Sequence, residues 1–334
     1  MKAIILLSGG LDSTIAAEIM SREGLELFAV NFKTPFCLCD KHGKTGCSGN
    51  FALKMADKLG IKFKIINATD NFLEVLKNPK YGYGANMNPC IDCRILFFRK
   101  SKEIMNEIGA SFIITGEVLG QRPMSQFKRQ MDIIEKEAGL EGLVVRPLSA
   151  KLLPATIPEK MGWINRERLL NIEGRSRKKQ MAFAKEFGVN DYPCAAGGCL
   201  LTDIGFAKKI KDLIKHNELD LSNINLLKAG RYFRLSDKAK LIVGRNEAGN
   251  ELLSRLSKEN DYIFRPSYVN GPVAIGRGAF EPDTIELSCK IVARYCDRDG
   301  NSETEVSYKK VPGIEEKLIN VKFLSENELA KIRV

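Results

Sequence analysis

The sequence has no long apolar run, which excludes a simple membrane anchor. No stretch reaches the roughly 18 apolar residues that a transmembrane helix needs. The short apolar run at the N-terminus ends at Leu7 and is not followed by a small-residue cleavage site, so we interpret it as a buried strand rather than a signal peptide. Internal repeats and low-complexity tracts are also missing. We therefore expect a globular, cytoplasmic protein that has no membrane partner.

Positive charge is in excess. The 334 residues include 52 Lys and Arg against 41 Asp and Glu, a net charge of +11. Such an excess favours a polyanionic partner, because Lys and Arg side chains near phosphates release condensed counterions. A basic surface that serves only solubility would give the same count. Charge alone therefore leaves the partner open.

The chain divides into three segments with different sequence patterns. Residues 1–150 alternate apolar strands with helical patterns, which predicts an α/β fold with a doubly wound parallel sheet. Residues 151–222 are basic and mostly helical. Residues 223–334 are expected to form a small β-rich domain, with a helix near 249–258. The strands expected in that domain lie at 232–235, 240–243, 262–264, 272–275 and 291–294.

A glycine loop joins the first expected strand to the first expected helix. It reads Ser-Gly-Gly-Leu-Asp-Ser from Ser8 to Ser13. Gly9 and Gly10 allow a tight turn that presents backbone N–H groups, and Ser13 lies in the first turn of the helix, where phosphate is favoured. Asp12 can cap the helix or hold Mg²⁺. A glycine-rich turn with an ordinary cap is the alternative, but the strand–loop–helix context favours phosphate binding.

This loop resembles the PP-loop of ATP-pyrophosphatases, which cleave ATP to AMP and pyrophosphate. The resemblance implies ATP and Mg²⁺ as ligands and an adenylated intermediate. That superfamily includes tRNA thiolases, asparagine- and GMP-synthetase-like enzymes and 7-deazaguanine nitrile synthases. The loop alone therefore leaves the acceptor of the adenylyl group open.

A second motif begins at Thr115, directly after an expected strand. It reads Thr-Gly-Glu-Val-Leu-Gly-Gln and resembles a segment of tRNA 4-thiouridine synthetases. Since it follows a strand of the parallel sheet, it should lie at the same sheet edge as the glycine loop. We expect Gly116 and Gln121 to contribute to the nucleotide site. A turn followed by a helix start, with incidental polar residues, is the alternative.

Two cysteines, Cys90 and Cys93, are expected at the N-terminus of a helix over 92–108 that Asp92 can cap. Arg94 and Arg99 lie nearby, and these surroundings are typical of cysteines with a lowered thiol pKa. Without a secretory signal, the spacing indicates metal binding or thiol chemistry rather than a disulfide.

The Asn-Pro-Cys-x-x-Cys pattern resembles the cysteine loop of tRNA 2-thiouridine thiolases. In those families a cysteine pair and a distant third cysteine hold a [4Fe–4S] cluster or relay a persulfide. The resemblance implies Cys90, Cys93 and Cys199 as the catalytic and metal-binding set, with Cys194 as a substitute third member. Zinc bound by four cysteines, including both Cys194 and Cys199, is the structural alternative.

The remaining cysteines are interpreted more simply. Cys37, Cys39 and Cys47 fit a second metal site, auxiliary sulfur handling or plain loop residues equally well. Cys289 and Cys296, on and beside the strand expected at 291–294, are interpreted as structural.

Two regions are expected to contact RNA. The first is a basic cluster before the Cys194–Cys199 loop; it consists of Arg175, Arg177, Lys178 and Lys179. A solvated helical face is its alternative reading. In the second region, the segments 230–235 and 243–246 resemble the RNA-binding module of the NFACT family, over roughly residues 225–310.

Together the motifs resemble a tRNA thiouridine synthetase. That resemblance implies adenylation of a uridine oxygen of tRNA and its replacement by sulfur from sulfide, a cysteine desulfurase or a sulfur carrier. Two rivals are a 7-deazaguanine nitrile synthase with structural zinc and a non-catalytic, nucleotide-gated RNA-binding factor. The sequence does not distinguish 2-thio from 4-thio products and does not indicate the tRNA position.

Overall fold

The computed structural model describes residues 1–37, 48–189, 198–297 and 303–334. The chain forms two compact units, Met1–Asp203 and Ile204–Val334. The sequence predicted three parts with boundaries at 150 and 222. Residues 151–203 instead belong to the first unit, because their apolar side chains, including Ile164, Leu169 and Ile172, are buried in the same core as the first strand.

The first unit contains a five-stranded parallel sheet, which confirms the expected fold class. Its strand order is β3-β2-β1-β4-β5. The strands are β1 (Lys2–Leu6), β2 (Glu26–Lys33), β3 (Lys62–Asn67), β4 (Phe112–Thr115) and β5 (Val144–Val145). The helices are α1 (Leu11–Ser21), α2 (Ser48–Lys58), α3 (Thr69–Lys77), α4 (Cys90–Glu107), α5 (Lys128–Ala138), α6 (Ile157–Lys160) and α7 (Lys178–Glu186).

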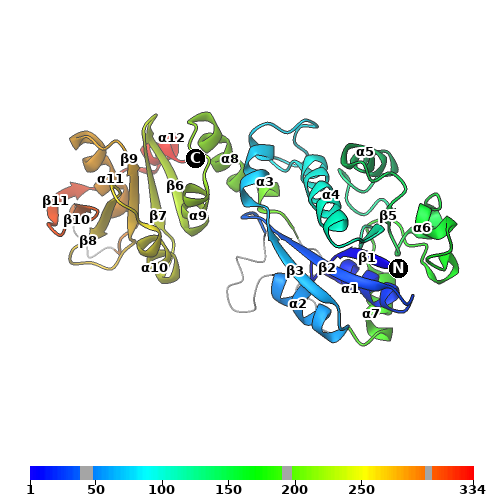
Figure 1. Cartoon of the computed structure of the whole chain (residues 1–334). Helices are drawn as coiled ribbons and strands as arrows, with labels where there is room; N and C mark the ends of the chain where they lie inside the picture. The colour runs from blue at the N-terminus through cyan, green and yellow to red at the C-terminus, as the bar shows by residue number, and fades with distance from the viewer. Residues whose placement is uncertain (38–47, 190–197, 298–302) are drawn as a thin grey trace. The chain divides into compact units, whose positions relative to one another are not determined.

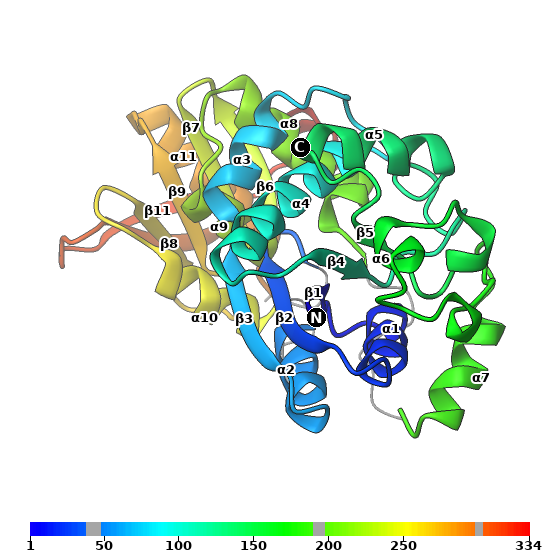
Figure 2. The same cartoon turned by 45° about the vertical axis from the view of Figure 1, so that its right-hand side comes forward.

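Helices cover both faces of this sheet (Figures 1 and 2). Ala3 and Ile5 of β1 pack with α1, α2 and α7 on one face. Ile4 and Leu6 point the other way and pack with α4 and α5. Because side chains alternate along a strand, a strand buried on both faces must be apolar, as β1 is from Ala3 to Leu6.

The second unit is built on a six-stranded antiparallel sheet of order β11-β10-β8-β9-β7-β6. The strands are β6 (Gly230–Ser236), β7 (Ala239–Gly244), β8 (Tyr262–Pro266), β9 (Ala274–Gly278), β10 (Glu303–Lys310) and β11 (Lys317–Lys322). The helices are α8 (Ile204–Lys215), α9 (Leu221–Ala229), α10 (Glu247–Leu256), α11 (Pro282–Arg294) and α12 (Glu326–Ile332). Helix α11 packs its apolar face on this sheet.

The strand expected at 291–294 is wrong, since these residues are the last turn of α11. Pro282 lies at the first positions of this helix, where its missing N–H is harmless, and Ser288, Cys289, Ile291 and Val292 share the buried face. A four-residue apolar run fits either a strand or a buried helical face, so its periodicity cannot decide. Strands β10 and β11 were not expected from the sequence.

Within the described ranges, no helix is both long and apolar enough to span a bilayer.

Candidate nucleotide and thiol site

The loop after β1 turns tightly onto the first turn of α1. Gly9 has φ 74°, a conformation that favours glycine. The Ser13 hydroxyl donates to the Gly10 carbonyl at 2.9 Å, and the Ser8 N–H donates to the Ser13 oxygen at 3.2 Å. Gly10 precedes the helix and provides no capping side chain. The first N–H groups of α1 are therefore oriented for an anion such as phosphate.

Asp12 does not cap α1, one of the two roles that the sequence allowed. Its Oδ2 accepts a hydrogen bond from Gln121 Nε2 at 2.9 Å, whereas Oδ1 is buried and has no hydrogen-bond partner among the described residues. Burial raises the pKa of the Asp12 carboxyl, and Gln121, Arg177 and Arg122 oppose this rise. A buried carboxylate oxygen without a partner is suited to a hard cation, so the residues present fit Mg²⁺.

Gly116 lies directly against the first turn of α1. A Cβ atom at this position would come within 2.5 Å of the Ser13 backbone nitrogen. The contact follows from the sheet, because Leu6 at the end of β1 is paired with Thr115 at the end of β4. The segment after Thr115 and the glycine loop thus meet at the carboxyl edge of the sheet, and any side chain larger than hydrogen would force them apart.

Cys199 is held near the start of α4 by backbone pairing. It forms an isolated antiparallel bridge with Cys37, next to which the Leu200 N–H donates to the Phe36 carbonyl at 2.8 Å. On the other side, the Met87 N–H donates to the Leu201 carbonyl at 3.2 Å. The segment 199–202 is therefore fixed between the loop after β2 and the loop before α4.

These contacts bring three of the cysteines together. Cys90 and Cys93 open α4, and the thiols of Cys90 and Cys199 both lie close enough to that of Cys93 to influence its charge. Cys37, for which the sequence left several roles open, faces Cys199 across the bridge. Cys194, Cys39 and Cys47 lie outside the described residues.

The thiol pKa values are raised, not lowered as the sequence predicted. Burial raises the pKa of Cys90 and of Cys93, and it raises the pKa of Cys199 to about 11. Protein atoms surround these partly exposed thiols densely, so the thiolate form is poorly solvated. Arg94 and Arg122 oppose this effect only in part. Arg94 is also paired with Glu117, and Arg99 is paired with Glu137.

The described residues do not present a ready metal site. Within them, no three Cys, His, Asp or Glu side chains are arranged so that they could hold a metal ion. The three thiols have the chemistry of cluster ligands, but as placed they do not form a ligand set. The structure brings the three thiols close together, but it does not arrange them around a metal ion.

Asp92 has a different role from the helix cap that the sequence suggested. Pro89 precedes α4 without a side-chain cap. The Asp92 carboxylate instead accepts hydrogen bonds from the N–H groups of Lys80 at 2.9 Å and Tyr81 at 3.1 Å. It therefore fixes the turn at 80–81 against α4.

Glu117 forms a buried ionic centre that the sequence analysis missed. Its side chain is 1% exposed and lies 3.2 Å from Arg94 Nε and 2.9 Å from Arg146 Nε. Burial alone would raise the pKa of Glu117, but Arg94 and Arg146 outweigh it and hold this pKa below its usual range. Arg146 also pairs with Glu135 of α5. This network ties the cysteine-bearing helix α4 to the segment after β4.

Arg122 links the two halves of the site. Its positive charge acts on the carboxyl of Asp12 and on the thiols of Cys90 and Cys199. Its backbone N–H donates to Gln126 Oε1 at 3.1 Å. The nucleotide loop and the thiols are therefore close enough to share one arginine. Arg122 directly follows the second motif in the sequence, but no sequence signal separated it from its neighbours.

The basic cluster at 175–179 does not act as one face. Arg175, Lys178 and Lys179 are exposed. Arg177 is half-buried, and its charge acts on Asp12. Its Nη1 atom is buried and has no hydrogen-bond partner within the described ranges. The cluster thus presents three cations to solvent and one to the nucleotide loop.

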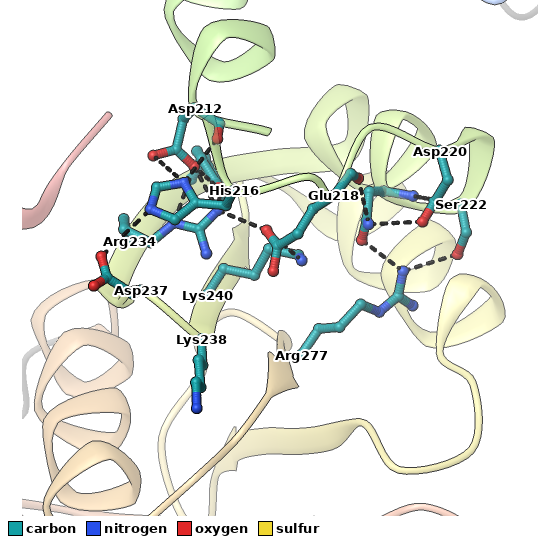
Figure 3. A network of polar contacts seen from close by, with 12 residues as sticks. Asp212, His216, Glu218, Asp220, Ser222, Arg234, Asp237, Lys238, Lys240 and Arg277 are labelled. Atoms are coloured by element: carbon teal, nitrogen blue, oxygen red, sulfur yellow. Dashed lines mark hydrogen bonds and ion pairs between the residues drawn. The ribbon is translucent and has the colours of Figure 1, made fainter. Parts of the chain in front are cut away.

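Arginines of the second unit are held in a polar network (Figure 3). Arg234 Nη2 lies 2.6 Å from Asp212 Oδ2 and 2.7 Å from Glu218 Oε2, and Lys240, 3% exposed, also pairs with Glu218. Arg277 pairs with Asp261 at 2.7 Å. These groups connect α8 and α9 to the sheet. Arg234, in the segment that suggested RNA binding, is therefore occupied by carboxylates.

Comparison with known proteins matches part of each unit to a family model. Residues 1–151 match the family model of thiamine biosynthesis protein (ThiI), and residues 230–333 match that of the NFACT protein RNA binding domain. The chain carries a ThiI-like PP-loop domain and an NFACT RNA-binding domain. Both resemblances expected from the sequence are confirmed.

Curated relatives of the PP-loop domain are tRNA thiouridylases. One from Petrotoga mobilis, "tRNA-specific 2-thiouridylase MnmA", is 33% identical over 130 residues, 35% of each chain. A protein of the same name from Methylorubrum extorquens is 24% identical over 64% of this chain and 54% of its own length. The chain thus spans between a third and about half of these relatives.

A solved 4-thiouridine synthetase–RNA complex with bound ATP is 22% identical, with a TM-score of 0.40, over 68% of this chain and 52% of that chain. At this score the likeness supports no comparison of individual residues.

Proposed function

We propose that this chain is an ATP-dependent tRNA sulfurtransferase. The observation that carries the proposal is that Asp12 of the PP-loop and the thiols of Cys90, Cys93 and Cys199 all lie within the influence of Arg122. A nucleotide site can activate a carbonyl oxygen, but replacing that oxygen with sulfur requires a sulfur-handling group at the same carbon. The family matches of the PP-loop domain to ThiI and of the C-terminal domain to an RNA-binding family support a tRNA substrate.

In the activation step, a uridine carbonyl oxygen attacks the α-phosphorus of ATP, and pyrophosphate leaves. Ser8, Gly9, Gly10 and Ser13 would hold phosphate oxygens, and Asp12 would hold Mg²⁺, which neutralises the departing charge. Gly116 would keep the loop closed on α1, and Gln121 would position the Asp12 carboxylate. The product is an O-adenylylated uridine whose leaving group is AMP.

In the sulfur step, a persulfide on one of the thiols of Cys90, Cys93 and Cys199 attacks the activated carbon through its terminal sulfur and expels AMP. A second thiol then attacks the sulfur that remains bonded to the cysteine, which releases thiouridine and leaves a protein disulfide. An external thiol reductant restores both thiols. A cysteine desulfurase or sulfur carrier would reload the persulfide.

A [4Fe–4S] cluster, which Cys90, Cys93 and Cys199 would hold, is the alternative that the resemblance implies, and it would supply the sulfur as sulfide. Protein purified without oxygen distinguishes the two routes. Iron and acid-labile sulfide near four each per chain, both lost in Cys93→Ala, would favour the cluster. Sulfane sulfur trapped on one of these thiols in iron-free, active protein would favour the relay.

tRNA is proposed to lie against the exposed cations Arg175, Lys178 and Lys179 and against the NFACT domain. Exposed Lys and Arg side chains contribute to RNA affinity through counterion release. The test of the whole proposal is pyrophosphate release from ATP by the purified chain. Release that depends on added tRNA and yields thiouridine supports it. ATP cleavage without tRNA, or RNA binding without any cleavage, would favour the two rival functions.

A further inference from the structure

Buried polar atoms without hydrogen-bond partners collect around Asp12. In the described part of the chain they include Asp12 Oδ1, Gln121 Oε1, Arg177 Nη1 and both side-chain polar atoms of Gln180. Gln180 is 0% exposed and Gln121 is 7% exposed. A buried polar group without a partner costs roughly 1–3 kcal/mol. Several such groups at one place indicate that a ligand satisfies them.

The four side chains come from three separate segments of the PP-loop domain. Asp12 lies in the first turn of α1, Gln121 follows β4, and Arg177 and Gln180 lie at the start of α7. Helices α1 and α7 pack on the same face of the sheet. Arg177 and Gln180 both oppose the burial-induced rise in the pKa of Asp12, so both lie beside its carboxyl.

The chemistry of these atoms matches a magnesium–polyphosphate chelate. Asp12 Oδ1 and Gln121 Oε1 are oxygen ligands of the kind that Mg²⁺ takes. Arg177 Nη1 and Gln180 Nε2 are donors of the kind that phosphate oxygens take, and the guanidinium adds a positive charge. We propose that α7 provides Arg177 and Gln180 as ligands for the Mg²⁺-bound pyrophosphate part of ATP.

This assignment rests on the proposed function only in that ATP is the nucleotide. It removes Arg177 from the RNA-binding set and gives it to the nucleotide site. It also explains why Gln180 is buried in an otherwise basic, exposed turn. Arg175, two residues earlier and exposed, provides the matched control for a change of charge in the same segment.

The test is calorimetric titration of the full-length chain with ATP, inorganic pyrophosphate or AMP, each with Mg²⁺ and without tRNA. Arg177→Met should weaken the binding of ATP and pyrophosphate by tenfold or more, since a hydrogen bond from a charged group is lost. AMP binding should not change, because AMP lacks the pyrophosphate part. Arg175→Met should bind all three like wild type and should weaken only tRNA binding.

Gln180→Met separates ligand binding from a structural role. Since neither side-chain polar atom of Gln180 has a hydrogen-bond partner among the described residues, Met should leave the ligand-free melting temperature unchanged or higher, while ATP·Mg²⁺ binds at least fivefold more weakly. A lower melting temperature with normal ATP affinity would overturn the assignment. So would equal losses of ATP and AMP binding in Arg177→Met. Failure of thiolation with these binding results intact would count against the proposed function alone.

Discussion

Neutralising Glu117 should destabilise the PP-loop domain more than any exposed charge change. In Glu117→Gln the shape of the side chain is kept, but Arg94 and Arg146 lose a carboxylate that lies 3.2 Å and 2.9 Å away. Each contact at ~3 Å corresponds to about 5 kcal/mol of Coulomb energy at an effective dielectric constant of ~20, before desolvation is subtracted. Removing one partner of a buried pair costs about 3–5 kcal/mol.

We expect Glu117→Gln to lower the free energy of unfolding by about 3 kcal/mol, the lower end of this range. The loss stays there because Arg146 keeps its ion pair with Glu135 and the Gln amide oxygen still accepts one hydrogen bond. Urea unfolding of wild type and variant at pH 7 measures the loss. Glu103→Gln, an exposed change on the same helix as Arg94, is the control and should stay within about 0.5 kcal/mol of wild type.

The pH dependence provides a second check. Arg94 and Arg146 hold the folded-state pKa of Glu117 below its unfolded value, so its contribution is complete above the unfolded pKa of about 4.3. The contribution is lost as the pH falls through the lower folded pKa. The difference between wild type and Glu117→Gln should therefore persist from pH 8 to pH 5 and shrink only below about pH 4. A variant as stable as wild type at pH 7 would refute the reasoning.

Four further variants test other parts of the site. Asp12→Ala and Ser13→Ala should abolish tRNA-dependent pyrophosphate release while circular dichroism stays unchanged; near-normal ATP cleavage by both would remove the PP-loop from the mechanism. Gly116→Ala should weaken ATP binding at least tenfold in calorimetry, because its Cβ would meet the Ser13 nitrogen at 2.5 Å; normal binding would show that the loop can shift freely. Charge reversal of the three exposed cations at 175–179 should lower the salt slope of tRNA binding by about 0.7 per lost phosphate contact; an unchanged slope would leave them as a solvated face.

The parallel sheet could be predicted because its signal is local. β1 is a continuous apolar run followed by a glycine loop and a helix, and each of these features can be read within about ten residues. The run at 291–294 had no such context, since four apolar residues fit a strand or the buried face of α11 equally well. Local sequence patterns therefore predicted the strands and helices of the first unit better than those of the second unit.

The sequence predicted which residues belong to the candidate site, but it did not predict their burial, their pKa values or their ion-pair partners. The motif spacing indicated Cys90 and Cys93, but their raised thiol pKa values come mainly from burial, which no local pattern shows. At Cys93 the thiol of Cys199, far away in the sequence, adds to the rise through its charge. The structural role of Glu117 requires Arg94 and Arg146, which no local pattern connects. In the same way, the sequence does not distinguish Arg177, whose charge acts on Asp12, from Arg175, which is exposed to solvent.

The most direct test of the central claim is mass spectrometry of tRNA nucleosides from cells that lack this chain. One thiolated uridine should be absent, should return when the wild-type chain is supplied, and should stay absent with Cys199→Ala. The Cys289→Ala chain should restore it, because Cys289 is buried in the other unit. An unchanged set of thiolated uridines in the deletion strain would contradict tRNA thiolation as the function.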